Sequence, residues 1–155
     1  MAKIDLDRIP EQQGSRYPTP FDVPCQERRV RRISDATGLT RLGVAHVRLP
    51  PGAWSSQRHF HTHEDEFVMV LQGEVVLCTD AGEEVLRAGD CVAFKAGVPD
   101  GHCAHNRSDS DAILLAVSNR DDGDGGEYPD IDLRAAAGRY GGKARFLRKD
   151  GTPYG

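Results

Sequence analysis

The stretch that decides the fold is Gly52–Gly73, which reads GAWSSQRHFHTHEDEFVMVLQG. The eight residues from His59 to Glu66 contain three histidines and three carboxylates, and they lie between two segments with the pattern of strands. Alternate side chains of a strand share a face, so His59 and His61 are expected to point the same way, about 7 Å apart. A turn after them would return Glu66 to the same point. This composition and spacing predict a metal site.

A second segment, Gly89–Asn106, again begins with a Gly-Asp turn and an apolar run, and it reads GDCVAFKAGVPDGHCAHN. We take His102 as the fourth ligand of the same ion, with Asp100, His105 or a water molecule as alternatives. Three imidazoles and one carboxylate suit several divalent ions. Ligand type alone therefore does not distinguish Fe, Mn, Ni, Cu or Zn.

Other residues that often carry chemistry have less defined roles. His63 shares the strand parity of the first two histidines but falls in the expected turn, which favours exposure to solvent. His46 lies in a strand-like segment and either lines the pocket or caps a sheet edge. The four cysteines lack the paired short spacing of zinc ribbons or redox motifs, so free, buried thiols are expected.

The two segments together resemble the two motifs of the cupin superfamily. The positions that carry the resemblance are Gly52, His59, His61, Glu66 and Gly73 in the first segment and Gly89, Gly97, His102 and Asn106 in the second. The second segment departs from the family pattern at Lys95, where proline is usual. It also has four residues rather than two between Gly97 and His102, and the shorter spacing would put Asp100 at the histidine position.

The resemblance implies an all-β fold, a double-stranded β-helix barrel that is closed enough to hold a small ligand and open at one mouth. It implies that His59, His61, Glu66 and His102 bind one divalent metal ion. It also points to a homodimer, which we expect to form through sheet edges.

Turn residues divide the chain into short apolar runs at regular spacing, which is typical of a β-sandwich or barrel. The expected strands are Val30–Ser34, Leu42–Leu49, Gln57–His61, Glu66–Leu71, Glu74–Cys78, Glu83–Leu86, Cys91–Lys95, His102–Arg107 and Ala112–Ser118. The strand Glu66–Leu71 has apolar residues at both parities after its first position, so it is predicted to be buried on both sides.

We expect one cupin domain over residues 1–155, with its barrel core at about 40–118. Residues 1–28 contain four prolines and few periodic apolar residues, which suggests an extended arm laid over the barrel or over a partner subunit. In the tail, residues 121–155, the segment Asp121–Gly126 is expected to be a flexible acidic turn and Asp130–Tyr140 to contain a short helix. The segment Phe146–Tyr154 is expected to add a strand or a lid.

Composition excludes several classes of protein. The sequence begins without the apolar core of a secretion signal and has no apolar run that could cross a bilayer, so we expect a cytoplasmic protein that does not enter membranes. A formal net charge of −4 argues against nucleic-acid binding. The local basic run of Arg28, Arg29, Arg31 and Arg32 is predicted to be an edge strand with a solvated face.

These features predict a metal-dependent enzyme of the oxygenase, isomerase or lyase type that acts on a small carboxylate, diketone or sugar-like substrate. The alternative is a metal-containing cupin that binds or senses a small ligand without catalysis. Catalytic residues besides the ion are left unassigned. A phosphosugar enzyme would need basic pocket residues, for which the sequence offers Arg48, Arg58, Lys95 and Arg107.

Overall fold

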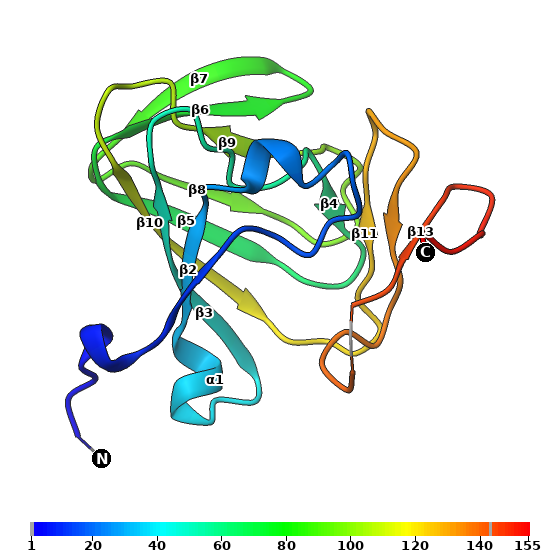
Figure 1. Cartoon of the computed structure of the whole chain (residues 1–155), viewed down its shortest axis with the longest axis horizontal. Helices are drawn as coiled ribbons and strands as arrows, with labels where there is room; N and C mark the ends of the chain where they lie inside the picture. Colours follow the sequence, from blue (N-terminus) through cyan, green and yellow to red (C-terminus); the bar gives the residue numbers. More distant parts are fainter. Residues whose placement is uncertain (1, 143) are drawn as a thin grey trace.

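The computed structural model describes residues 2–142 and 144–155, and two β layers face each other across a common interior (Figure 1). One layer is a six-stranded antiparallel sheet in the order β1-β2-β3-β10-β5-β8. Its strands are β1 (Glu11–Gln13), β2 (Arg29–Arg32), β3 (Leu42–Leu49), β10 (Ala112–Asn119), β5 (Glu66–Gln72) and β8 (Cys91–Phe94).

The second layer consists of two smaller antiparallel sheets. The first contains β7 (Gly82–Arg87), β6 (Glu74–Thr79) and β9 (Cys103–His105), and the other contains β13 (Phe146–Leu147), β12 (Arg134–Ala135), β11 (Gly126–Glu127) and β4 (Phe60–His61). An isolated bridge between His59 and His102 joins the two sheets, because the chain before β4 runs beside the chain before β9. The helices are short: 3-10 turns at Leu6–Arg8 and Val23–Cys25, and α1 at Ile33–Thr37.

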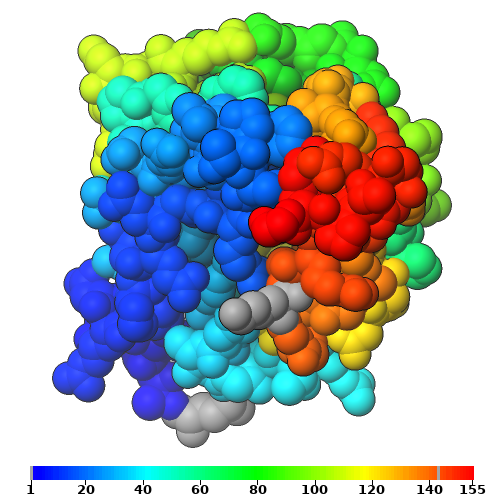
Figure 2. Space-filling view, turned by 45° about the vertical axis from the view of Figure 1, so that its right-hand side comes forward, coloured from blue at the N-terminus to red at the C-terminus, as the bar shows by residue number. Residues whose placement is uncertain are grey.

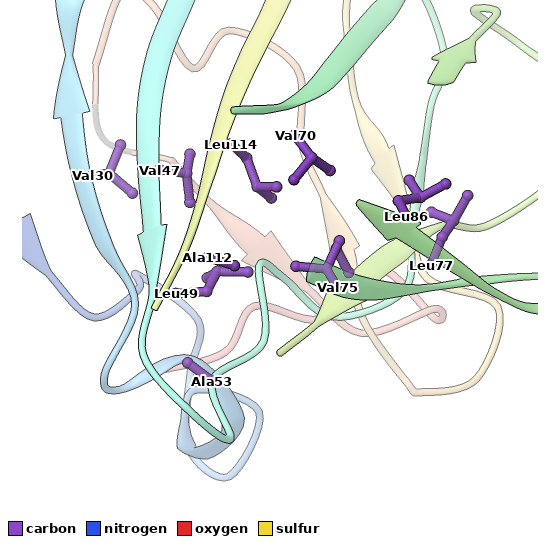
Figure 3. Packing of buried hydrophobic residues seen from close by; sticks show 11 residues of the cluster. Val30, Val47, Leu49, Ala53, Val70, Val75, Leu77, Leu86, Ala112 and Leu114 are labelled. Carbon is purple, nitrogen blue, oxygen red and sulfur yellow. The ribbon is translucent and has the colours of Figure 1, made fainter. Parts of the chain in front are cut away.

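The core lies between the layers and is built from alternate side chains of the strands (Figure 3). The large sheet contributes Val47, Val70 and Leu114, and the smaller β7-β6-β9 sheet contributes Leu77 and Leu86. These side chains are less than a tenth exposed. The predicted all-β barrel is therefore confirmed, and its interior follows from period-two alternation.

The prediction that Glu66–Leu71 is buried on both sides is wrong. Val70 faces the core and is fully buried, whereas Phe67 and Leu71, on the opposite face of β5, are 39% and 45% exposed. The reason is that the second layer covers only the inner face of the six-stranded sheet. The sequence pattern identifies two apolar faces but does not show how many of them the chain itself can cover.

The predicted helix in Asp130–Tyr140 is also wrong, because this segment forms β12 and turns instead. Leu133 is fully buried beside β12, and the strand pairs with both β11 and β13. Tertiary pairing thus overrides the modest helix propensity of the Ala-rich stretch. The expected strand Val30–Ser34 is also shorter than predicted, because α1 begins at Ile33; this helix ends at Thr37 and is capped by Gly38, whose φ is 75°.

The first motif ends at Gly73, where β5 turns into β6. Its φ is 74°, in the left-handed region that favours glycine, and an added Cβ would lie 2.7 Å from the carbonyl oxygen of Asp111. Both the turn and this close approach of two chain segments require glycine here.

Both ends of the chain pack on the barrel. The N-terminal arm adds β1 to the edge of the large sheet, so β2 and its arginines are not at the edge as predicted. The arm and the C-terminal tail lie next to each other on one face of the molecule (Figure 2). The rings of Tyr17 and Phe146 are 5.4 Å apart, and those of Phe21 and Tyr154 are 5.9 Å apart. No helix in the described part of the chain is long and apolar enough to span a membrane.

We predict that Leu133→Ala lowers the free energy of unfolding by about 2–5 kcal/mol, because it leaves a cavity at a fully buried position of the tail. Leu39→Ala, at a site that is 42% exposed, is the matched control and should change stability by less than about 0.5 kcal/mol. Urea denaturation of both variants measures the difference. Equal stability of the two would show that the tail does not contribute to the core.

Candidate metal centre

Four side chains from three segments meet at the wall of a cavity of about 320 Å³. His59 precedes β4 and His61 lies in it, Glu66 is the first residue of β5, and His102 immediately precedes β9. The bridge between His59 and His102 aligns the two segments, and the turn between β4 and β5 returns Glu66 to the pair of histidines. These are the four residues that the sequence predicted as ligands.

The distances between the donor atoms of His59, His61 and Glu66 fit one ion, and His102 joins them through Glu66. The Nε2 atoms of His59 and His61 are 3.2 Å apart, and Glu66 places one carboxylate oxygen 3.5 Å from Nε2 of His61 and the other 3.1 Å from Nε2 of His102. Two ligands that each lie 2.0–2.2 Å from a metal ion are separated by roughly 3 to 3.5 Å at tetrahedral or octahedral angles. The cluster therefore has the dimensions of a coordination sphere.

Hydrogen bonds on the far side of two imidazoles set their tautomers. Nδ1 of His59 donates to the carbonyl oxygen of Gln57 at 2.8 Å, and Nδ1 of His61 donates to the Asp124 carboxylate at 2.7 Å. Neutral imidazoles bonded in this way have a lone pair on each Nε2, and two lone pairs that face each other cannot form a hydrogen bond. Either a proton on Nε2 of His61 or a metal ion between the two rings would satisfy both nitrogen atoms.

The electrostatics favour the ligand forms of two groups. Burial and the neighbouring imidazoles lower the pKa of His59 to about 3, so this ring is neutral at neutral pH. Burial raises the pKa of Glu66, but hydrogen bonds with His102 and His61 have a larger, opposite effect. The net pKa is therefore well below its usual value. Burial also lowers the pKa of His61, but its bonds with Asp124 and Glu66 raise the net pKa to about 9. A metal ion would therefore displace a proton from His61 at neutral pH.

The structure adds a residue that the sequence analysis did not identify. Asp124 is 1% exposed, and besides His61 it accepts hydrogen bonds from the backbone N–H groups of His63 and Glu64. The expected flexible acidic turn is thus an anchored support of the site. No spacing rule could have found it, because Asp124 lies 63 residues after His61 in the chain.

Glu64 connects the same region to the end of the tail. Its carboxylate is buried, and it accepts from the backbone N–H of Asp121 at 3.0 Å, from the hydroxyl of Tyr140 and from the guanidinium of Arg139. The loop that separates His61 from Glu66 is therefore held by two segments of the C-terminal tail.

The remaining candidate ligands lie elsewhere. Asp100 accepts a hydrogen bond from the backbone N–H of Asp80 and lines a smaller hollow that His61 and His102 also border. His105 stacks on Trp54 with ring centroids 3.9 Å apart and faces Cys103 and Cys78.

The other two histidines lie away from the cavity. His63 is exposed, as predicted. His46 pairs with Arg31 across the outer face of the large sheet and does not line the cavity. Of the cysteines, Cys25 and Cys103 are buried, whereas Cys91 is exposed, against expectation.

The basic residues proposed for the pocket are also displaced. Arg48 pairs with Glu11 and Asp111, Arg58 with Asp130 and Asp80, and Arg107 with Glu83, while Lys95 lines the smaller hollow that His61 and His102 also border. The cavity instead has four other arginines in its wall, Arg16, Arg28, Arg32 and Arg139. They come from the arm, from β2 and from the tail.

A crystal structure from Silicibacter pomeroyi, described as a sugar phosphate isomerase from a cupin superfamily, is 43% identical to this chain. The match covers 99% of this chain and 97% of that protein, with a TM-score of 0.92. The chain belongs to the cupin superfamily. The family model of the Cupin domain matches residues 45–118 of this cupin, which confirms the resemblance of its motifs.

Two other solved structures are similar to this cupin. A protein of Acidithiobacillus ferrooxidans that is proposed to be a sugar phosphate isomerase is 26% identical, over 80% of this chain and 78% of its own, with a TM-score of 0.72. A predicted oxalate decarboxylase of Thermotoga maritima is 22% identical, over 76% of this chain and 98% of its own, with a TM-score of 0.62, and it shows the fold alone. The comparison with curated proteins finds no match.

We predict that His61→Ala abolishes stoichiometric metal binding and that Asp124→Asn weakens metal affinity by about 10–100-fold, because the support of a ligating imidazole is lost. Metal content of the purified variants and competition with a chelator measure both effects. Asp100→Asn is the control and should keep full metal content. Loss of metal in Asp100→Asn together with retention in His102→Ala would reverse the assignment of the fourth ligand.

Proposed function

We propose that this cupin binds one divalent metal ion through His59, His61, Glu66 and His102 and isomerises a small sugar-like substrate in the adjoining cavity. The observation that carries this proposal is the convergence of four metal-ligand donors on the wall of a cavity of about 320 Å³. The description of the Silicibacter pomeroyi relative as a sugar phosphate isomerase supports the reaction class.

A bound ion would supply a Lewis acid that polarises a carbonyl or hydroxyl oxygen of the substrate. Isomerisation of an aldose to a ketose transfers a proton from one carbon to its neighbour and another between the two oxygens, so it needs no oxidant or reductant. The donor set fits Fe, Mn, Ni, Cu or Zn.

The rest of the cavity suits a partly apolar, hydroxylated substrate. Its inner wall is formed by core side chains such as Val70 and Leu77, which exclude water. The hydroxyls of Tyr17 and Tyr128 lie 3.4 Å apart, and the ring of Tyr128 is 5.7 Å from that of His59. Burial raises the pKa of Tyr128 to about 12, so its hydroxyl stays protonated and can donate to a substrate oxygen.

We predict that the metal-loaded protein interconverts members of a panel of aldoses and ketoses, tested in free and phosphorylated form. In D₂O, proton NMR should show deuterium entering the carbon next to the carbonyl, because the transferred proton exchanges with solvent. His61→Ala should be inactive, and Asp100→Asn should remain active. Saturable binding of a sugar with no interconversion would instead support a non-catalytic binding or sensory cupin.

We also propose that residues 1–155 form one domain. The arm pairs with β2, and the tail strand β11 pairs with β4, which carries His61. Because both additions extend sheets of the barrel, neither end has a separate core.

We further propose that the protein is a homodimer. The edge strands β1 and β8 of the large sheet have three and four residues and offer little backbone for edge pairing. The outer face is more suitable, because Phe67 and Leu71 are exposed there and Phe67 lies beside Val117 on the neighbouring strand β10. A second copy of the chain could cover this apolar face with its own.

We predict a dimeric mass by light scattering at micromolar concentration and a monomeric mass for Phe67→Lys, which would place a charge in the apolar contact. Val98→Lys changes a residue that is 46% exposed in a loop outside the sheet, and it should stay dimeric. A monomeric wild-type protein would exclude the dimer, and a dimeric Phe67→Lys would place the interface elsewhere.

A further inference from the structure

The cavity beside the metal cluster continues into a groove of about 650 Å³ between the N-terminal arm and the C-terminal tail. Glu66 lines both hollows, and so do Arg16, Arg28, Arg32 and Arg139. A molecule that occupies the cavity could therefore touch the metal cluster with one end and the arginines with the other.

The alternation of β2 aims two of these arginines inward. Arg28 and Arg32 have the same parity as Val30, which is 6% exposed and belongs to the core. The two arginines between them point the opposite way, toward the carboxylate of Glu11 on the outer face. The basic run that the sequence analysis assigned to a solvated face is thus divided, and half of it faces the cavity.

Among the residues that the structure describes, three of the inward arginines have no carboxylate partner. In residues 2–142 and 144–155, no acidic oxygen lies within 4.0 Å of the guanidinium groups of Arg16, Arg28 or Arg32. Arg28 donates to backbone carbonyl oxygens and Arg32 donates to the side-chain amide of Gln12. Arg139, in contrast, is paired with buried carboxylates.

Guanidinium groups that lie close together repel each other, and this repulsion acts on Arg32. Burial, followed by the charges of Arg16 and Arg28, lowers the pKa of Arg32. An anion among the three guanidinium groups would reverse the repulsion and form charge-assisted hydrogen bonds. Each guanidinium group can donate two parallel hydrogen bonds to the oxygens of a phosphate. Three guanidinium groups offer more N–H donors than one carboxylate can accept, whereas a phosphate dianion has enough oxygen atoms to accept them.

We propose that Arg16, Arg28 and Arg32 form a subsite for the phosphate group of a phosphate monoester, whose sugar end lies at the metal cluster. The proposal rests on the proposed function for the role of that cluster. All three arginines lie outside residues 45–118, the segment that the Cupin domain model matches. The barrel motifs would thus supply the metal ligands, and the arm together with β2 would supply recognition of the anion.

The test is calorimetric titration of inorganic phosphate into the metal-loaded protein. Arg16→Gln and Arg32→Gln should each weaken phosphate binding by about tenfold or more, since each removes a charge-assisted hydrogen bond. Arg134→Gln is the matched control: Arg134 pairs with Glu127 and lines neither hollow, so phosphate affinity should not change. Any phosphate bound by the ion itself is common to all four proteins, and thermal unfolding checks that the variants are folded.

Phosphate affinity that is equal in the wild type and in the double variant Arg16→Gln/Arg32→Gln would overturn the subsite. Malonate bound as tightly as phosphate would also overturn it, because it would show a carboxylate site. A sugar monophosphate that binds more tightly than free phosphate supports the ester, and tighter binding of free phosphate contradicts it.

The two proposals fail separately. Arginine-dependent phosphate binding without any isomerisation would retain the subsite and reject the enzyme. Isomerisation of free and phosphorylated sugars with equal kcat/KM, unchanged in the double variant, would retain the enzyme and reject the subsite.

Discussion

The arrangement of the candidate metal centre depends on the buried carboxylate of Asp124. It accepts the Nδ1–H of His61 at 2.7 Å and two backbone N–H groups of the loop that follows. A buried carboxylate is stable only when it is hydrogen-bonded or paired with a cation, and this one has both kinds of partner, since Arg139 lies 3.4 Å away. The bond thus fixes a ring at the cluster and ties the barrel to the tail.

The same constraint explains why the tail folds onto the barrel. Gly126–Glu127 pairs with Phe60–His61, directly after Asp124, so the tail strand and the histidine strand extend one sheet. The buried carboxylate of Glu64 accepts hydrogen bonds from Arg139 and Tyr140, so the tail contacts the barrel at a second point. Removing the tail would leave the buried carboxylate of Glu64 without its partners and Nδ1 of His61 without its acceptor, which is more costly than losing the apolar contacts alone.

The arm and strand β2 line another part of the cavity wall, where the pleat of the strand decides which side chains face inward. Strand β2 carries a basic run, but its pleat sends alternate arginines to opposite faces, and within the described residues the outer ones meet a carboxylate and the inner ones do not. The wall of the cavity therefore carries both a cluster of electronegative donors and a group of arginines. An anionic substrate with a polarisable oxygen at its far end fits such a distribution of charge.

The sequence by itself determined the all-β barrel, its core strands and the four residues that converge at the cavity. These follow from local rules: period-two alternation, turn glycines such as Gly73, and the spacing of His59, His61 and Glu66 within one hairpin-like unit. His102 was also predicted, although its longer spacing left Asp100 open; in the structure a backbone bridge places His102 beside His59, whereas Asp100 accepts from the backbone N–H of Asp80.

Only the tertiary structure decided the support of His61 by Asp124, the inward direction of Arg28 and Arg32, the exposure of Phe67 and the strand in place of a helix near Leu133. Each of these depends on contacts between segments far apart in the chain or on which face a neighbouring segment covers. A local pattern specifies which side chains share a face, but the partner of that face is set by the packing of the whole chain.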